Sequence, residues 1–282
     1  MKKHCSVVVL YNPIFSEISK FINQLINSKY FLFIIDNSEK KLGKEFDVFI
    51  DNPSVIYKNF NKNKGLAFAQ NQGINEAISR NFETVSLFDQ DSFISSKNYI
   101  KLIEAFKQSK FDIMSPLIVS KNDHSKVEES LKINFVGWPS PIKVVKSKML
   151  HPADIVIASG LTCSLKIFEE VGFFNEDFFI DYLDIEWCLR ARNKGKKIAV
   201  NSLVTLFHSI GMGQENYTLF KPQIHPPERT FYQFKNNLAL FKKKHIPTLY
   251  CLHELFANLL SLTIKILLKK QNRKKHLFYF WK

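Results

Sequence analysis

Hydrophobic positions along the first ninety residues fall into two alternating patterns. Continuous apolar runs occupy residues 6–11 (SVVVLY) and 30–35 (YFLFII), and such runs are typical of strands buried on both faces of a parallel sheet. Between them, residues 17–27 repeat apolar side chains at the spacing of an amphipathic helix. A helix at residues 65–80 and a strand at 84–88 continue the alternation. The pattern predicts an α/β fold with a doubly wound, mixed and mainly parallel sheet flanked by helices.

The second half of the chain is less regular. Prolines interrupt residues 120–152, where we expect a loop-rich excursion. An apolar strand resumes at residues 155–164, and residues 184–194 predict an amphipathic helix that ends at a glycine. A last strand is expected at residues 198–207.

The C-terminal part is predicted to be helical and carries most of the positive charge. Residues 229–243 and an apolar amphipathic segment after them predict two helices. From residue 242 onward ten basic residues stand against one acid, so this part holds about nine of the fourteen net positive charges. We therefore expect one large domain over residues 1–225 and a basic amphipathic helical extension over residues 226–282.

A basic amphipathic extension is typical of a segment that lies in the interface of an anionic membrane. The alternative is a helical cap with an ordinary lysine-rich exterior. Polar side chains within the apolar segment argue against a span of the bilayer. Nucleic-acid binding would place basic residues among exposed aromatic ones, and that arrangement is not evident here, so no nucleic-acid partner is expected.

Composition and cysteine spacing limit the class of protein further. A hydrophobic content of 45% with a net charge of +14 describes a globular protein that has an anionic partner. The four cysteines form no C-x-x-C pair, so neither a disulfide framework nor a zinc module is expected. The first apolar run is too short for a signal peptide. We expect a cytoplasmic protein, peripheral on the inner face of the cytoplasmic membrane.

Polar residues follow three of the predicted strands, and open α/β sheets bind ligands at such strand ends. Asn12 follows the first strand, Asp36 and Asn37 follow the second, and Asp89 and Asp91 follow a later one. Residues two apart on an extended chain point to the same side, so Asp89 and Asp91 repel each other unless a cation or a proton lies between them. Their oxygens suit Mg²⁺ or Mn²⁺, which can hold a diphosphate; solvated turn aspartates are the alternative.

With these motifs the chain resembles the inverting family 2 glycosyltransferases of the GT-A fold, and among them the bacterial rhamnosyltransferase-like group. The matching segments, in chain order, are VVVLYNP, IIDNS, NKGLAFAQNQGI, LFDQDS, IASG, VGFFNEDFFIDYLDIEWCLRARNKG and HSIG. They cover about residues 5–215 in the expected order. The resemblance implies a GT-A sheet, a nucleotide-sugar donor and a divalent metal, either Mg²⁺ or Mn²⁺.

The resemblance also implies a nucleotide side of the cleft. The residues it places there are Tyr11, Asn12, Asp36, Asn37, Asn63, Gly65, Asn71 and Asp89. Asp36 would accept a hydrogen bond from the base, Asp89 would meet the ribose and the metal, and Asp91 would ligate the metal. The sequence alone fits a simple turn at Asp36 and Asn37, and a polar contact on a helix side at Asn71, equally well.

The general base implied by the resemblance is Asp184 in DYLDIEW, four residues before Cys188. A carboxylate there can take the proton of the acceptor hydroxyl as it attacks from the face opposite the diphosphate. Asp181 is the second candidate for this role. Asp184 also fits a helix N-cap, where Asp is favoured. Leu183 stands where the wider family has Glu, a departure shared with the rhamnosyltransferase-like group.

Further residues gain a role from the resemblance. Gly160 of IASG, Trp187 and Arg190 would contact the donor or acceptor sugar, and His208 would complete the metal or diphosphate site. The alternatives are a core tryptophan, an ion pair between Arg190 and Glu186, and a structural histidine.

The resulting hypothesis is a metal-dependent enzyme that moves a sugar from a nucleotide donor to a growing, lipid-linked cell-surface polysaccharide. The first donor expected is dTDP-L-rhamnose, and a UDP-hexose is the alternative. A sugar nucleotidyltransferase or a non-catalytic scaffold are alternatives from other classes. No glycine-rich phosphate loop follows Tyr11, and both Asp91 and Asp184 are present, which argues against these two.

Overall fold

The protein is described by a computed structural model. The residues it describes are 3–121, 123–124, 127, 130–145, 148–209, 227–268, 275 and 278–279.

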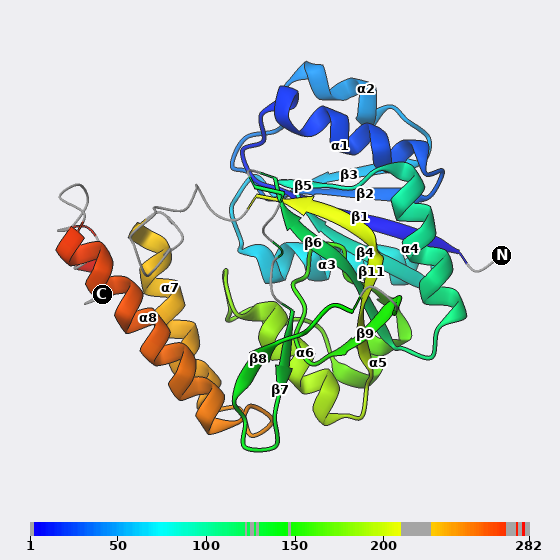
Figure 1. Cartoon of the computed structure of the whole chain (residues 1–282). Helices are drawn as coiled ribbons and strands as arrows, with labels where there is room; N and C mark the ends of the chain where they lie inside the picture. The colour runs from blue at the N-terminus through cyan, green and yellow to red at the C-terminus, as the bar shows by residue number, and fades with distance from the viewer. Residues whose placement is uncertain are drawn as a thin grey trace.

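A curved mixed sheet forms the centre of the molecule (Figure 1). Its strands are β1 (His4–Leu10), β2 (Phe31–Asp36), β3 (Val55–Asn59), β4 (Thr84–Asp89), β5 (Ser92–Phe93), β6 (Ile113–Ser120), β9 (Leu150–Ala153), β10 (Thr162–Ser164) and β11 (Ile198–His208). The order is β3-β2-β1-β4-β10-β6-β11-β5, with β9 paired to β11. Strands β1 to β4 run parallel, as do β6 and β11, whereas β10 is antiparallel to both of its neighbours. The predicted mixed, mainly parallel sheet is confirmed.

Helices cover both faces of this sheet. They are α1 (Phe15–Asn27), α2 (Asp47–Ile50), α3 (Leu66–Ser79), α4 (Ser96–Gln108), α5 (Lys166–Val171) and α6 (Leu183–Asn193), with a short 3-10 turn η1 at Lys44–Phe46. Every residue of β1 is buried, because alternate side chains enter opposite layers. Val7 and Val9 pack in the layer of α3, α5 and α6, and Val8 and Leu10 pack in the layer of α1, α2 and α4.

The region expected to be a loop-rich excursion contains a small second sheet. Strands β7 (Leu131–Ile133) and β8 (Pro139–Pro141) form an antiparallel hairpin beside the main body. At its tip Gly137 has a φ of +95°, and a Cβ there would lie 2.4 Å from Pro247. The tip therefore touches the turn between the last two helices.

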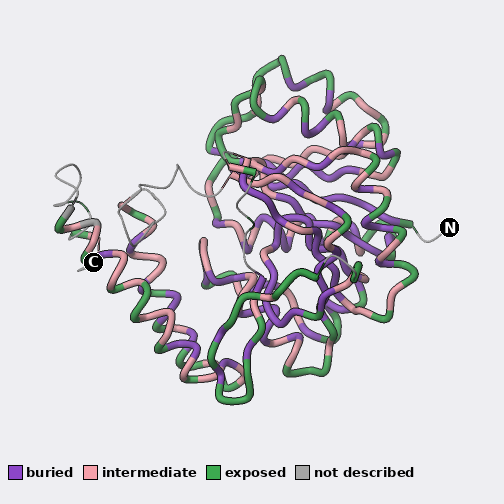
Figure 2. Tube along the Cα trace, in the orientation of Figure 1, coloured by how far each residue is buried: buried purple, intermediate pink, exposed green. Residues whose placement is uncertain are grey.

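The last two helices, α7 (Pro227–Leu240) and α8 (Thr248–Leu268), run antiparallel as a C-terminal helical hairpin (Figure 1). Its inner residues Leu240, Ile246, Tyr250 and Cys251 belong to the same hydrophobic cluster as α3 and α6, and Figure 2 shows the alternation of buried and exposed positions along both helices. Among the described residues no helix is long and apolar enough to cross a membrane. The expected domain boundary at residue 225 and most of the basic cluster at 269–275 lie outside the described residues.

Candidate active site

Strand pairing brings two aspartates and a histidine together at one edge of the sheet. Asp89 ends β4, and the chain then turns back so that β5 pairs antiparallel with the end of β11, with Ser92 opposite His208. His208 Nε2 consequently lies 3.2 Å from Asp91 Oδ1 and 3.8 Å from Asp89 Oδ2. One ligand atom from each of the three residues lies within 4.8 Å of the others.

This group has the properties of a cation site. Burial by itself lowers the pKa of His208, but hydrogen bonds and charge from Asp89 and Asp91 raise that pKa to about 10. The imidazolium therefore balances two carboxylates whose negative charge a divalent ion would balance equally well. Asp89 Oδ1 is buried and has no hydrogen-bond partner among the described residues, so it is an acceptor without a donor. Two carboxylates and one imidazole fit a divalent cation.

Asp184 lies next to this group, in the first turn of α6. It accepts hydrogen bonds from the backbone N–H of Ile185 at 2.9 Å and of Ala158 at 3.3 Å. Burial raises its pKa, those backbone bonds lower it and the charge of Asp89 raises it, which brings the pKa to about 6. Asp184 and Asp89 therefore lie within electrostatic reach of each other. The N-cap position of α6 is Tyr182, so Asp184 does not cap the helix.

Residues 157–160 (IASG) connect Asp184 to the turn between β4 and β5, which carries Asp89 and Asp91 and is called the aspartate turn below. Ala158 contacts Asp184, and the hydroxyl of its neighbour Ser159 hydrogen-bonds that of Ser92. Gly160 has a φ of +82°, and a Cβ at this position would lie 2.6 Å from Pro116. A glycine is therefore required for the tight turn. Its contact with a sugar stays a prediction.

Asp181, the second candidate base, is held by a cation. Arg229 Nε lies 2.8 Å from Asp181 Oδ2 and 3.0 Å from Oδ1, so the guanidinium binds both carboxylate oxygens. Both carboxylate oxygens are thus engaged by the guanidinium and less open to an acceptor hydroxyl.

Tyr11 and Asn12 lie where β1 meets the aspartate turn. Gln90 Oε1 accepts from Tyr11 N at 2.8 Å, and Ser38 Oγ accepts from Asn12 N at 2.7 Å. The side chain of Tyr11 is 43% exposed and is thus open to a ligand. Gln90, to which the sequence motifs assign no role, connects the end of β1 to the pair of aspartates on either side of it.

Asp36 is fully buried beneath this surface. Tyr57 Oη and Asn59 Nδ2 each donate to its Oδ2 at 2.7 Å, and Ser38 N donates to its Oδ1 at 3.0 Å. The carboxylate therefore fixes the ends of β2 and β3. Its hydrogen bond to a base stays a prediction, and would require the base to reach a side chain that is fully buried.

An asparagine network shapes the entrance to α3. Asn37 Nδ2 donates to Asn63 Oδ1 at 2.9 Å, and Asn63 Oδ1 accepts also from Gly65 N at 3.0 Å. Gly65 has a φ of +90°, and a Cβ there would lie 2.8 Å from the carbonyl oxygen of Phe179. Farther along α3, Asn71 exchanges hydrogen bonds of 2.9 and 3.1 Å with the backbone of Phe174, which is the polar helix contact that the sequence left open.

Two predicted sugar contacts are corrected by the structure. Trp187 is 0% exposed, donates from Nε1 to the carbonyl oxygen of Gly172 at 2.8 Å, and packs against Phe168 and Phe174. It has no ring face open to a sugar. Arg190 donates to Glu186 and to the carbonyl oxygens of residues 171 and 173, all at 2.8–3.0 Å. Both side chains join α5 to α6, because the buried side of α6 faces the aromatic residues that precede it.

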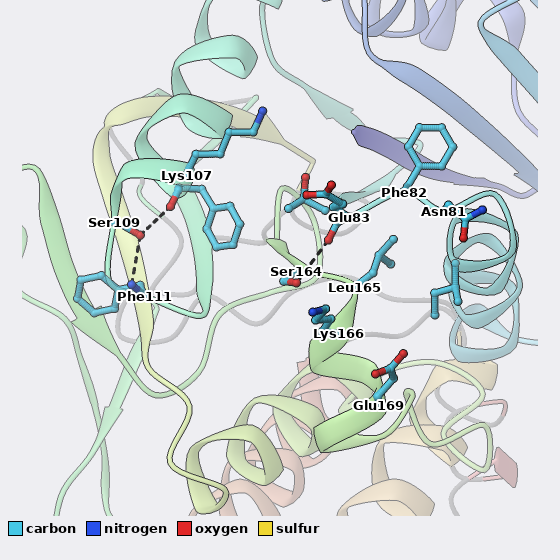
Figure 3. A pocket seen from close by; sticks show the side chains of 13 residues that line it. Asn81, Phe82, Glu83, Lys107, Ser109, Phe111, Ser164, Leu165, Lys166 and Glu169 are labelled. Carbon is cyan, nitrogen blue, oxygen red and sulfur yellow. Dashed lines mark hydrogen bonds between the residues drawn. The ribbon is translucent and has the colours of Figure 1, made fainter. Parts of the chain in front are cut away.

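A cavity of about 880 Å³ lies elsewhere, at the amino end of β4 (Figure 3). Its lining includes Glu83, Ser164 and Lys166, and among the described residues around it none belongs to the predicted site. The paired carboxylates of Asp89 and Asp91 lie at the opposite, carboxyl end of the same strand, and Asp184, whose pKa is raised, lies beside them. We therefore place the candidate active site at the carboxyl end.

Comparison with known proteins shows which family of proteins the chain resembles. The chain is 30% identical over 275 residues to dTDP-rhamnosyl transferase RfbF of Shigella flexneri, covering 96% of this chain and 92% of that protein. It is 25% identical over 189 residues to the low-salt glycan biosynthesis hexosyltransferase Agl10 of Haloferax volcanii, covering 65% of this chain and 60% of that one.

Among solved structures, GalNAc-T7 with UDP, GalNAc and Mn²⁺ has the same fold, with a TM-score of 0.61 at 16% identity over 73% of this chain and 43% of that one. Residues 5–171 match the sequence profile described as Glycosyl transferase family 2. That match spans more than half of the sequence and agrees with the relative of almost equal length, and on these grounds the chain belongs to glycosyl transferase family 2.

Proposed function

We propose that this glycosyltransferase moves L-rhamnose from dTDP-L-rhamnose to a hydroxyl of a growing polysaccharide, with inversion at the anomeric carbon. The observation that carries the proposal is the position of Asp184, a carboxylate of raised pKa, beside the Asp89–Asp91–His208 group. The choice of donor is supported by the rhamnosyltransferase that is 30% identical over almost the whole chain.

In this mechanism Asp184 acts as the general base. It takes the proton of the acceptor hydroxyl while that oxygen forms a bond to the anomeric carbon, and the bond from that carbon to the diphosphate oxygen breaks on the opposite face. With a pKa of about 6, the carboxylate is ionised at neutral pH and still basic enough to accept a proton. Asp89, Asp91 and His208 would hold a divalent cation, Mg²⁺ or Mn²⁺, which supplies positive charge to the leaving diphosphate.

The donor's nucleotide is proposed to lie over the ends of β1, β2 and β4. Tyr11 is open to a ligand there, and Asn12 is fixed by Ser38 beside it. The network of Asn37, Asn63 and Gly65 would shape this side of the pocket by holding the loop before α3 rather than by direct contact.

A panel of donors tests the proposal. We expect dTDP-L-rhamnose with Mn²⁺ or Mg²⁺ to raise the melting temperature of the purified protein and to be hydrolysed slowly, and EDTA to remove both effects. The matched variant Asp91→Asn should bind the metal and the donor more weakly. If no nucleotide sugar stabilises the protein and metal has no effect, the proposal is wrong.

A UDP-hexose is the second candidate donor, supported by the hexosyltransferase relative. Stabilisation by UDP-glucose, UDP-galactose or UDP-N-acetylhexosamine in the same panel, without a response to dTDP-L-rhamnose, would select it.

The acceptor is proposed to be a lipid-linked glycan at an anionic membrane surface. Support comes from Leu252, Phe256 and Leu259, which are 48%, 70% and 42% exposed along one side of α8.

A further inference from the structure

The residues just before Asp184 adopt a backbone conformation that their side chains do not favour. Asp181 and Tyr182 have φ values of +65° and +63°, so two consecutive residues other than glycine lie in the left-handed region. Such a conformation persists only where surrounding contacts hold it, and it is often found near functional sites. We call residues 180–182 the base loop, because α6 and Asp184 follow it directly.

Helix α7 holds the base loop from one side. Arg229 binds both oxygens of the Asp181 carboxylate. Two turns farther along α7, Asn236 Nδ2 donates to the carbonyl oxygen of Ile180 at 2.7 Å and to that of Asp181 at 3.1 Å. Asn236 is 0% exposed, so these two bonds are made away from water.

Helix α8 holds the same loop through Tyr182. The Tyr182 hydroxyl donates to Glu254 Oε2 at 3.1 Å and accepts from Asn258 Nδ2 at 2.8 Å. The two helices are themselves joined where Asn237 Nδ2 donates to the carbonyl oxygen of Cys251 at 3.3 Å. The hairpin therefore contacts both left-handed residues, each through a different helix.

We infer that the C-terminal helical hairpin positions the general base, with Arg229, Asn236, Glu254 and Asn258 as positioning residues. The left-handed pair turns the chain so that α6 begins at Leu183, and this start brings the Asp184 carboxylate to Ala158 N. Without the four side chains the loop would relax toward ordinary φ values and carry Asp184 away from the acceptor hydroxyl. The inference rests on the proposed function of Asp184.

The base loop also borders the proposed nucleotide side of the site. Donor affinity can therefore distinguish a local displacement of Asp184 from a general loss of structure in this region. The carbonyl oxygen of Phe179 accepts from Leu66 N at 2.7 Å, and the Phe179 ring stacks on Tyr232 of α7 at 4.9 Å. A general collapse of this region would therefore weaken donor binding together with transfer. Displacement of Asp184 alone would lower kcat and leave the donor affinity in place.

The test compares the variants Arg229→Gln, Asp181→Asn and their double mutant, with Lys235→Gln as the matched control. Lys235 is an exposed cation on the same helix. We expect each single variant to lower kcat at least tenfold, with the donor dissociation constant within about twofold. The double mutant should lose no more than the single ones, because the pair acts as a unit. Arg229→Lys should recover only part of the rate, since lysine cannot bind both oxygens.

If Arg229→Gln does not fold, the variant Tyr182→Phe, which removes one oxygen atom, tests whether the hairpin positions Asp184. It too should lower kcat and leave donor binding unchanged. Normal kcat in these variants, or an equal loss of kcat and donor affinity, would overturn the inference. Failure of the proposed function is distinguishable, because Asp184→Asn would then itself retain transfer.

Discussion

At the scale of single residues, the catalytic role proposed for Asp184 and the stability of the protein oppose each other. The folded protein raises its pKa from an ordinary value of 3.8 to about 6, mainly through burial. Ionisation at neutral pH therefore costs the folded state about 1 to 3 kcal/mol. This cost is typical of active sites, where charge is kept in surroundings that do not fully solvate it.

The first prediction concerns Asp184→Asn. We expect transfer to fall by at least a thousandfold, while donor affinity is retained and the melting temperature at pH 8 rises by a few degrees. The gain in stability should vanish near pH 4, because the wild-type carboxyl is then protonated as well. Thermal melts at both pH values and a transfer assay measure this. Transfer near the wild-type rate would move the base role to another residue.

The pH dependence of catalysis follows from the same shift. Since the folded pKa is raised, the proposed base Asp184 is protonated below about pH 6 and then cannot accept a proton. We expect kcat to fall about tenfold per pH unit below that value. The stability contributed by this group runs in the opposite direction, increasing as pH falls from about 6 to 4, because the folded state binds the additional proton. A kcat that stays constant down to pH 4.5 would contradict the assignment.

At the scale of elements, the two sides of α8 have different surroundings. One side presents Tyr250 and Cys251, both 0% exposed, to the core, and Glu254 and Asn258 to the base loop. The other side exposes Phe256. The interpretations of the extension as a cap and as a membrane segment are therefore compatible, since they use different sides of the same helix.

Point substitutions on α8 test membrane binding better than truncation, because removing the helix would also remove buried core residues. We expect the double variant Leu252→Ser, Phe256→Ser to sediment less with vesicles containing anionic lipid, and to retain its melting temperature. Phe135→Ser, which changes an aromatic side chain that is 99% exposed on the β7–β8 hairpin, is the control. Vesicle binding equal to wild type in the double variant would contradict the membrane proposal.

At the scale of the whole molecule, local sequence patterns predicted the sheet and the edge of it where the candidate site is proposed to lie. Apolar runs identified the strands, and the position of Asp89 and Asp91 after one of them indicated the edge where His208 joins them. Local patterns did not predict that Trp187 and Arg190 are engaged inside the protein. Helical spacing puts them on one side of α6, but whether that side is buried depends on residues 168–174, which spacing within α6 does not reveal.

The contacts to the base loop were also beyond local patterns. Arg229 and Asp181 are 48 residues apart, and Asn258 and Tyr182 are 76 apart. A polar residue on an amphipathic helix carries no local sign of the distant partner that it will meet. Such contacts are found only once the packing of the hairpin against the sheet is known.

The pairing of β5 with β11 has a consequence for the order in which the protein matures. Ser92 meets His208 only through that pairing, and 116 residues separate the two along the chain. While residue 208 is still inside the ribosome, Asp89 and Asp91 of the nascent chain have no contact with His208. The Asp89–Asp91–His208 group can therefore assemble only after residue 208 has left the ribosome.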